Sequence, residues 1–208
     1  NLDSFINKNI SRTKKMIKMC EKKNINLIFL STSSYYPNNK KSKENDKLFC
    51  YDLYSTCKIL CEKLILRSKL KNYLILRISN IYGKGGNSYI EKLLKIKKNK
   101  KKTIYENKNT IRDFIFINDL LLVISKFLQT KINKEIYNVG SGKGYNLYKL
   151  YDFAYKNKLI SKIEFNKVNF TPPRPFYVAN INKLEKRINL KLNHNLLMYI
   201  KNEFSIQI

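Results

Sequence analysis

The sequence predicts an α/β protein built on a parallel sheet. Short apolar blocks such as residues 26–30 and 73–77 have the length and composition of buried strands. Two amphipathic stretches with apolar residues at helical spacing, residues 4–23 and 50–70, each precede one of these blocks. Helices that alternate with buried strands are typical of parallel sheets. Hydrophobic residues make up 43% of the 208, which is enough for a folded core.

The elements are predicted in the following order. A strand over residues 25–30 follows the first helix and leads into a Ser/Thr/Tyr loop that ends at Pro37. A polar stretch over 38–47 precedes the second helix, and a strand over 73–78 follows it. The remaining elements are a helix after residues 82–86 that ends in a Lys cluster, short strands near 103–105 and 114–117, a helix over 118–130, a strand over 135–139, a helix from residue 146, a strand over 162–168 and two closing helices.

The chain is strongly basic, with 42 Lys and Arg against 15 Asp and Glu and a formal net charge of +27. Only six of these cations are Arg, whereas the recognition of bases and phosphates favours Arg and clusters its cations on one face. The dense run over 92–102 is interpreted as a solvated helix end and not as a nucleic-acid patch. We therefore expect no specific nucleic-acid partner, although the positive field attracts anionic ligands.

Two common kinds of site are excluded by residue counts. Cys20, Cys50, Cys57 and Cys61 show no CxxC spacing, and His194 is the only histidine, so neither a zinc site nor a His-based triad can be assembled. The sequence also has no apolar run of the roughly 18 residues needed to span a bilayer and no secretory signal at its start. We therefore expect a soluble, cytoplasmic protein.

Tyr54 and Lys58 are the first candidates for catalysis. They lie four residues apart on the predicted helix over 50–70, so their side chains share one face. A phenol with a reference pKa of about 10 is a poor base at neutral pH, but a neighbouring ammonium group stabilises the phenolate. The spacing alone is a weak signal, because a chain with 15 Tyr and many Lys produces it by chance.

Small hydroxyl side chains at residues 31–34 provide the context for this pair. They follow the strand over 25–30 and lie at the carboxyl end of a parallel strand, where open α/β sheets bind ligands. A hydroxyl there could share a hydrogen bond with the substrate oxygen that Tyr54 deprotonates. The alternative interpretation of the same residues is an ordinary turn.

Ordered motifs then identify a family. The chain resembles the extended short-chain dehydrogenase/reductase family, in its NAD-dependent nucleotide-sugar epimerase/dehydratase branch, and is similar to the UDP-glucose 4-epimerases. The motifs are residues 9–13 (NISRT), 29–36 (FLSTSSYY), 54–58 (YSTCK), 76–83 (LRISNIYG), 111–119 (IRDFIFIND), 137–142 (YNVGSG), and 174–176 (RPF) followed by 180–183 (NINK).

The resemblance implies an incomplete Rossmann-like parallel sheet with helices and a smaller α+β substrate-binding portion. Residues 1–83 would be the distal part of the NAD-binding domain. Residues 84–208 would mainly bind the nucleotide sugar, with a segment over about 107–139 returning to the sheet. Members of this family commonly form homodimers through two helices, here about residues 4–23 and 50–70.

The resemblance also implies a role for each site residue. Tyr54 would be the acid/base, Lys58 would hold the nicotinamide ribose, and Thr32 would bond the sugar hydroxyl that is oxidised. The implied sets are Thr32, Tyr54 and Lys58 for catalysis, Asn9, Tyr54 and Lys58 for the NAD(P) cofactor, and Thr32, Asn80, Arg112 and Arg174 for the nucleotide-sugar substrate, with no metal.

Three reactions of the family are compared on this basis. Family dehydratases carry an Asp-Glu pair after the hydroxyl residue, whereas this chain has Ser33 and Ser34, neither of which can act as a carboxylate base. Dehydration is therefore disfavoured. An epimerase is the leading prediction, and a nucleotide-sugar 4-keto reductase is the alternative.

The glycine-rich loop G-x-x-G-x-x-G, which receives the pyrophosphate of NAD in this family, does not occur in the sequence. The resemblance therefore implies a fragment without the amino-terminal part, and we expect this chain alone to bind NAD very weakly. A second prediction is a catalytically dead remnant or a basic binding module. Departures from the family pattern favour it: Arg12 replaces a Gly, and Tyr177 and Asn180 each replace an Asp.

Overall fold

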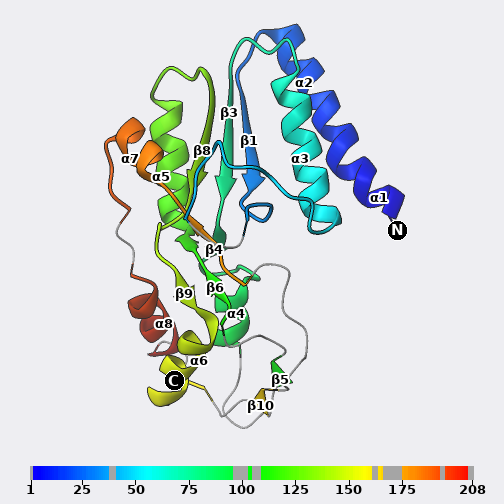
Figure 1. Cartoon of the computed structure of the whole chain (residues 1–208). Coiled ribbons are helices and arrows are strands. Elements are labelled where there is room, and N and C mark those ends of the chain that lie inside the picture. Colours follow the sequence, from blue (N-terminus) through cyan, green and yellow to red (C-terminus); the bar gives the residue numbers. More distant parts are fainter. Residues whose placement is uncertain are drawn as a thin grey trace.

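The structure is a computed structural model, and it describes residues 2–37, 41–95, 103–104, 109–160, 164–165, 175–192 and 195–205. Figure 1 labels the elements along the chain. The helices are α1 (Leu2–Ile6), the π-helical segment η1 (Asn7–Ser11), α2 (Arg12–Lys23), α3 (Leu53–Leu66), α4 (Tyr89–Leu94), α5 (Ile117–Leu128), α6 (Leu147–Lys156), α7 (Asn182–Ile188) and α8 (Leu196–Ser205). The strands are β1 (Leu27–Thr32), β2 (Lys41–Ser42), β3 (Tyr73–Ile78), β4 (Asn80–Tyr82), β5 (Thr103–Ile104), β6 (Ile111–Arg112), β7 (Phe114–Phe116), β8 (Lys134–Val139), β9 (Tyr145–Asn146), β10 (Glu164–Phe165) and β11 (Val178–Ala179).

The main sheet is parallel and has the order β1-β3-β8, so β3 lies in the middle. All six residues of β3 are buried. Tyr73 and Ile75 pack in the cluster that contains residues of α2 and α3, whereas Leu74 and Leu76 pack in the cluster that contains residues of α5. Because successive side chains of a strand point to opposite faces, an apolar run without alternation requires cover on both faces.

Helices provide that cover. In Figure 1, α2 and α3 lie on one side of the sheet and α5 and α7 on the other. This arrangement confirms the predicted α/β class with a parallel sheet. The chain leaves the sheet after β3 and returns to it at β8. The predicted division into two domains stays a prediction.

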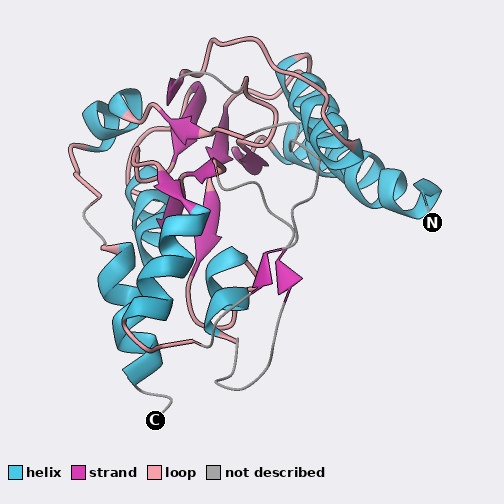
Figure 2. Cartoon of the chain, turned by 60° about the horizontal axis from the view of Figure 1, so that its bottom comes forward, coloured by secondary structure: helices cyan, strands magenta, loops and turns pink. Residues whose placement is uncertain are grey.

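A third cluster of buried residues lies beyond the carboxyl ends of the main strands. Helices α4, α6 and α8 contribute most of it, and Tyr82 and Phe114 from β4 and β7 pack against them. Figure 2 shows these three helices gathered at the end of the molecule that carries the C-terminus. The remaining strands form two-stranded pairs, namely β2 with β11, β4 with β7, β5 with β10 and β6 with β9.

The observed elements differ from the predicted ones mainly at their ends. The helix predicted over residues 4–23 is interrupted by η1, and the helix predicted over 50–70 is α3. Helix α3 begins after Asp52, whose side chain accepts a hydrogen bond of 2.7 Å from the Ser55 N–H and so caps the helix. Only β10 is described within the strand predicted over 162–168. Within the described ranges, no helix is long and apolar enough to cross a membrane.

Asp113, between β6 and β7, ties three segments together. Its fully buried carboxylate accepts hydrogen bonds from the N–H and hydroxyl groups of Ser141 (2.9 and 2.7 Å), from the Gly142 N–H (3.1 Å) and from the Ala179 N–H (3.0 Å). Burial raises the pKa of Asp113 to about 6, and these hydrogen bonds oppose the shift. Gly140 permits this approach, because a Cβ there would lie 2.6 Å from a carboxylate oxygen of Asp113.

We expect Asp113→Asn to destabilise the fold. An amide keeps one acceptor oxygen and places an NH2 group against buried N–H donors, so the free energy of unfolding should fall by about 1–3 kcal/mol. Urea unfolding followed by circular dichroism measures this loss. Asp152→Asn is the matched control, because Asp152 forms a solvent-exposed pair with Lys156 on α6 and such pairs contribute at most about 1 kcal/mol. Equal losses in the two variants would contradict the anchoring role of Asp113.

Candidate functional site

Lys58 of α3 reaches the carboxyl end of β1. Its Nζ donates a hydrogen bond of 2.9 Å to the carbonyl oxygen of Leu30 and lies 4.9 Å from the ring centroid of Phe29 and 5.9 Å from that of Tyr54. Burial lowers the pKa of Lys58, while the charges of Cys61 and Glu62 oppose this effect. The Tyr54 side chain is 43% exposed, so a ligand can reach it beside the amine. The structure therefore brings the two predicted catalytic residues of α3 together.

A hollow of about 400 Å³ lies beside Lys58, between the helices η1 and α2 and the strand β1. Leu27, Ile28, Phe29 and Met16 give it an apolar part. None of the described residues that line it is acidic. The polar or charged residues of its lining are Lys8, Asn9, Arg12, Thr13 and Lys58.

Asn9, predicted to face the cofactor, thus lies in the same hollow as Lys58. The Asn9 side-chain Nδ2 donates a hydrogen bond to the main-chain carbonyl oxygen of Phe5 (2.9 Å). The main-chain carbonyl oxygen of Asn9 accepts one from the Thr13 hydroxyl (2.7 Å), and both bonds stabilise η1. An apolar wall with positive groups around it suits a ligand that combines an aromatic ring with negative charge.

A smaller pocket of about 120 Å³ lies where β1 and β3 end. It brings together Thr32, Asn80 and Arg112, three of the four residues predicted to bind the substrate. Arg174, the fourth, lies outside the described residues. The described residues that line the pocket are Thr32, Ser33, Ser34, Ile78, Ser79, Asn80, Arg112 and Tyr177.

Local hydrogen bonds hold the three predicted residues in place. Thr32 Oγ1 accepts from the N–H of Ser34 (3.1 Å), so the turn that the sequence offered as an alternative is also present. Asn80 Nδ2 donates to the carbonyl oxygen of Asp113 (2.9 Å). Arg112 Nη1 donates to two main-chain carbonyl oxygens, those of residues 111 (2.9 Å) and 175 (3.3 Å). Each side chain is therefore fixed at the pocket by contacts to the backbone.

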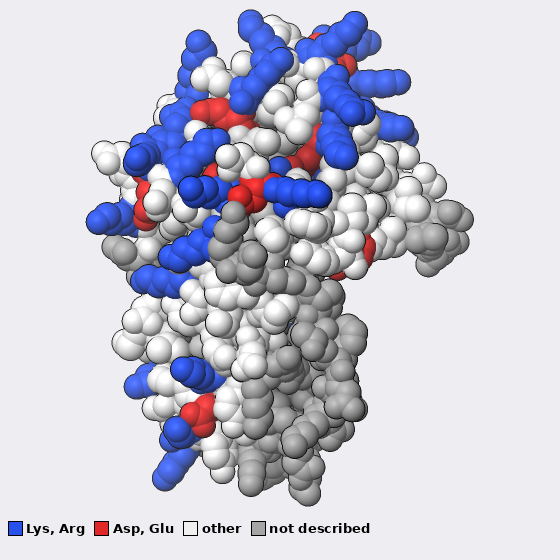
Figure 3. All heavy atoms as spheres, in the orientation of Figure 1, with Lys and Arg blue, Asp and Glu red and all other residues white. Residues whose placement is uncertain are grey.

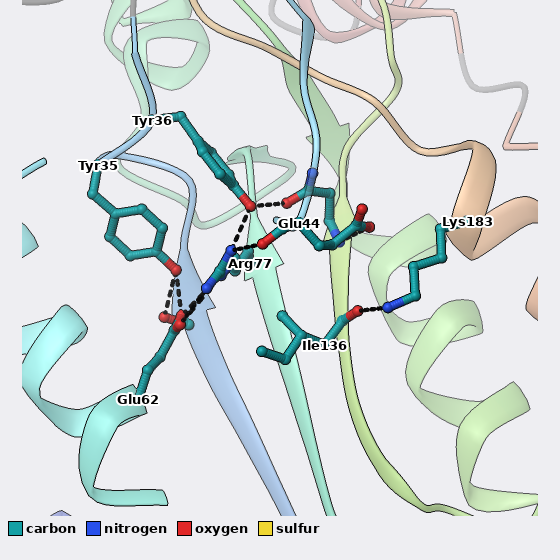
Figure 4. A network of polar contacts seen from close by, with 9 residues as sticks. Tyr35, Tyr36, Glu44, Glu62, Arg77, Ile136 and Lys183 are labelled. Carbon is teal, nitrogen blue, oxygen red and sulfur yellow. Dashed lines mark hydrogen bonds and ion pairs between the residues drawn. The ribbon is translucent and has the colours of Figure 1, made fainter. Parts of the chain in front are cut away.

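A buried polar network behind these residues, shown in Figure 4, was not predicted from the sequence. Arg77 of β3 forms an ion pair with Glu62 of α3, with Nη2 and Oε2 2.7 Å apart, and its Nη1 donates to the hydroxyl of Tyr36 (2.8 Å). The Tyr35 hydroxyl donates to Glu62, and the Tyr36 hydroxyl donates to Asn138 of β8 (2.7 Å). The available signal was a charged residue inside each of two apolar stretches, the strand over 73–78 and the helix over 50–70.

The network connects the two parts of the candidate site. Glu62 lies one helical turn after Lys58 on α3, while Tyr35 and Tyr36 lie on the loop that begins with Thr32. Arg77 bonds to both, so it fixes α3 against this loop. The relative position of the Tyr54–Lys58 pair and of the Thr32 hydroxyl thus depends on one buried ion pair.

Comparisons with known proteins agree with the motifs. The model of the NAD dependent epimerase/dehydratase family matches residues 1–140. A curated relative, the ADP-L-glycero-D-manno-heptose-6-epimerase of Brachyspira hyodysenteriae, is 28% identical, and the match covers 76% of this chain and 55% of that protein. The chain therefore spans about half the length of the curated relative.

Solved structures of related enzymes share the fold. The dTDP-glucose 4,6-dehydratase of Bacillus anthracis, solved with NAD, has a TM-score of 0.84 at 19% identity, with 99% of this chain and 69% of that chain covered. The ADP-L-glycero-D-manno-heptose-6-epimerase of Helicobacter pylori has a TM-score of 0.80 at 17% identity, with 99% and 67% covered. At these identities the likeness concerns the Rossmann-like fold.

We expect Glu62→Leu to lower the free energy of unfolding by about 3–5 kcal/mol, because it leaves the Arg77 guanidinium buried without its counter-charge. The double variant Glu62→Leu, Arg77→Met removes both charges and should recover at least about 1 kcal/mol of this loss. Urea denaturation of the native chain, both single variants and the double variant gives the coupling energy. Strictly additive losses would contradict the assigned ion pair.

Proposed function

Because the chain belongs to the NAD dependent epimerase/dehydratase family, we propose that it carries the acid/base and substrate-binding groups of a nucleotide-sugar epimerase. One observation supports this assignment above the others: the Lys58 amine is bound to the end of β1 with the Tyr54 ring beside it, and Thr32 lies at the end of the same strand. The proposal assigns to this chain the proton-transfer half of the reaction.

The hollow beside Lys58 fits the nicotinamide-nucleotide end of NAD, because its apolar wall at Phe29 suits the ring and its positive groups suit the neighbouring phosphate. Asn9 and Lys58, which line the hollow, would face the cofactor there, and Tyr54 would face it from beside the Lys58 amine. NAD, when bound, supplies the hydride acceptor and donor for the sugar carbon. The sequence contains no G-x-x-G-x-x-G, so the proposal gives this chain no glycine-rich contact with the pyrophosphate.

Tyr54 would take the proton of the sugar hydroxyl as that carbon loses its hydride, which gives a keto-sugar. Lys58 would hold the nicotinamide ribose beside Tyr54, and the Thr32 hydroxyl would hold the reacting oxygen. Tyr54 would return the proton once the keto-sugar had turned over and regained hydride on its other face. The reaction is balanced, because the cofactor and the tyrosine both end in their starting state.

Charge and cysteine usage support the same assignment. Arg112, with Arg174 and Asn80, would bind the diphosphate of the nucleotide, and a planar guanidinium suits that group.

All four cysteines are described and none forms a disulfide, as is common in a reducing compartment. We therefore propose a cytoplasmic enzyme.

Ser33 and Ser34 in the pocket favour epimerisation over dehydration, because neither can act as a carboxylate base.

Tyr54→Phe tests the central assignment. It should reduce turnover roughly a hundred- to ten-thousand-fold, because only the proton-transfer group is lost, and should leave affinity for the nucleotide sugar nearly unchanged. Turnover is measured on the polypeptide that carries this chain, with NAD and a panel of ADP-, UDP- and dTDP-sugars, by chromatography of the products.

Tyr51→Phe is the matched control for Tyr54→Phe. Tyr51 lies just before α3 and its ring packs against that of Phe49, whereas the Tyr54 ring lies beside the Lys58 amine. It should therefore retain full turnover. If Tyr54→Phe retained turnover as well, the acid/base role of Tyr54 would be wrong, and a reduced sugar as the main product would indicate a reductase.

A further inference from the structure

The small pocket is lined by more hydroxyl groups than the proposed reaction uses. Thr32 is assigned to the reacting oxygen, but Ser33, Ser34, Ser79 and Tyr177 also line the pocket of about 120 Å³. They come from three parts of the chain, namely the loop after β1, the end of β3 and the segment that leads into β11. A pocket of this size holds a few water molecules or the edge of one sugar ring.

Three of these hydroxyl groups are buried and lack a well-aligned hydrogen bond to a described residue, although the Tyr177 hydroxyl lies close to those of Ser33 and Ser79. They are Ser34 Oγ, Ser79 Oγ and Tyr177 Oη. Leaving a buried hydroxyl unpaired costs about 1–3 kcal/mol, so buried polar groups in folded proteins nearly always have partners. A hydroxyl can donate one hydrogen bond and accept two, so a contact between Tyr177 and Ser79 still leaves both groups able to bond a ligand in the pocket.

Tyr177 is the most strongly constrained of the three. Only 5% of it is exposed, and its ring stacks on that of Tyr36 with a centroid distance of 6.1 Å and an interplanar angle of 5°. Its main-chain N–H donates to the carbonyl oxygen of Ile111 (3.0 Å). The phenol is thus held in one orientation, with its hydroxyl near those of Ser33 and Ser79.

Burial raises the pKa of Tyr177 well above its usual value, so the group is a neutral donor and acceptor. Ser34 and Ser79 line the pocket with buried hydroxyls, and rotation about χ1, a small change for serine, would turn these hydroxyls toward a ligand. Groups that both donate and accept match the hydroxyls of a sugar, which also do both.

We propose that this pocket receives a hydroxyl-bearing part of the sugar of a nucleotide-sugar substrate, and that Tyr177, through its hydroxyl, is a specificity-determining residue of the site. This inference rests on the proposed function. The Tyr177 hydroxyl would bond the sugar hydroxyl, or orient the Ser79 hydroxyl that does so. A site built to pair a substrate hydroxyl discriminates against ligands that lack it, because its own buried groups are then left unpaired.

Tyr177→Phe removes only the hydroxyl and keeps the ring that stacks on Tyr36. Isothermal titration calorimetry of the 208-residue chain uses ADP-glucose and UDP-glucose, each compared with ADP or UDP alone. We expect the variant to bind the sugar nucleotide about five- to tenfold more weakly, the effect of one neutral hydrogen bond, and the free diphosphate equally well. Ser79→Ala should show the same selective loss and provides a second variant if Tyr177→Phe does not fold.

Ser42→Ala is the matched control, because Ser42 Oγ is also buried without a partner among the described residues but does not line the pocket. Its affinities should not change. Unchanged sugar-nucleotide affinity in both pocket variants, or equal weakening for the free diphosphate, would overturn this inference and leave the proposed function in place. A native chain that binds neither sugar nucleotide nor diphosphate would overturn both.

Discussion

The ion pair between Glu62 and Arg77 is the constraint on which the site depends. Strand β3 is buried on both faces, so a guanidinium there must be neutralised and fully hydrogen-bonded to be tolerated. Glu62 of α3 supplies the negative charge. The hydroxyl of Tyr36, on the loop after β1, accepts a further hydrogen bond from Arg77. Apolar packing alone permits a helix to slide or rotate by small amounts over a sheet, whereas a buried pair with two fixed partners selects one arrangement. In this arrangement Lys58, one turn before Glu62, meets the end of β1.

Two different cavities border β1, the hollow along residues 27–29 and the small pocket at the carboxyl end of the strand. In a parallel sheet all strands end on the same edge, and loops that leave neighbouring strands meet there. On one side, Lys58 borders a hollow with apolar walls and positive groups. On the other side, Thr32 borders a pocket lined mostly by neutral hydroxyls. The proposed reaction takes hydride from a sugar carbon and a proton from its oxygen, so it would need a cofactor site and a sugar site close together, and both cavities border β1.

The sequence predicts the parts of the fold whose stability is local. Periodicity located the three main strands and most of the helices, because each is long enough to show an apolar face. The short strands β2, β4, β6, β9 and β11 have two or three residues each, and they form only because distant partners supply their hydrogen bonds. Spacing likewise found Tyr54 and Lys58, which share a helix. It could not pair Arg77 with Glu62, or find the donors of Asp113, because those contacts join elements far apart in the chain.

The strong positive charge and the neutral pocket act at different ranges. Figure 3 shows Lys and Arg spread widely over the upper part of one face, with no single stripe. Such a field attracts any anionic nucleotide and weakens with salt, because the Debye length is only about 8 Å at physiological ionic strength. It cannot distinguish one sugar from another. Discrimination requires short, directional contacts whose loss leaves a buried group unpaired, and such groups lie in the pocket at Ser34, Ser79 and Tyr177. Compositional change at the surface therefore alters how fast nucleotides arrive, whereas a change at Tyr177 alters which sugar is retained.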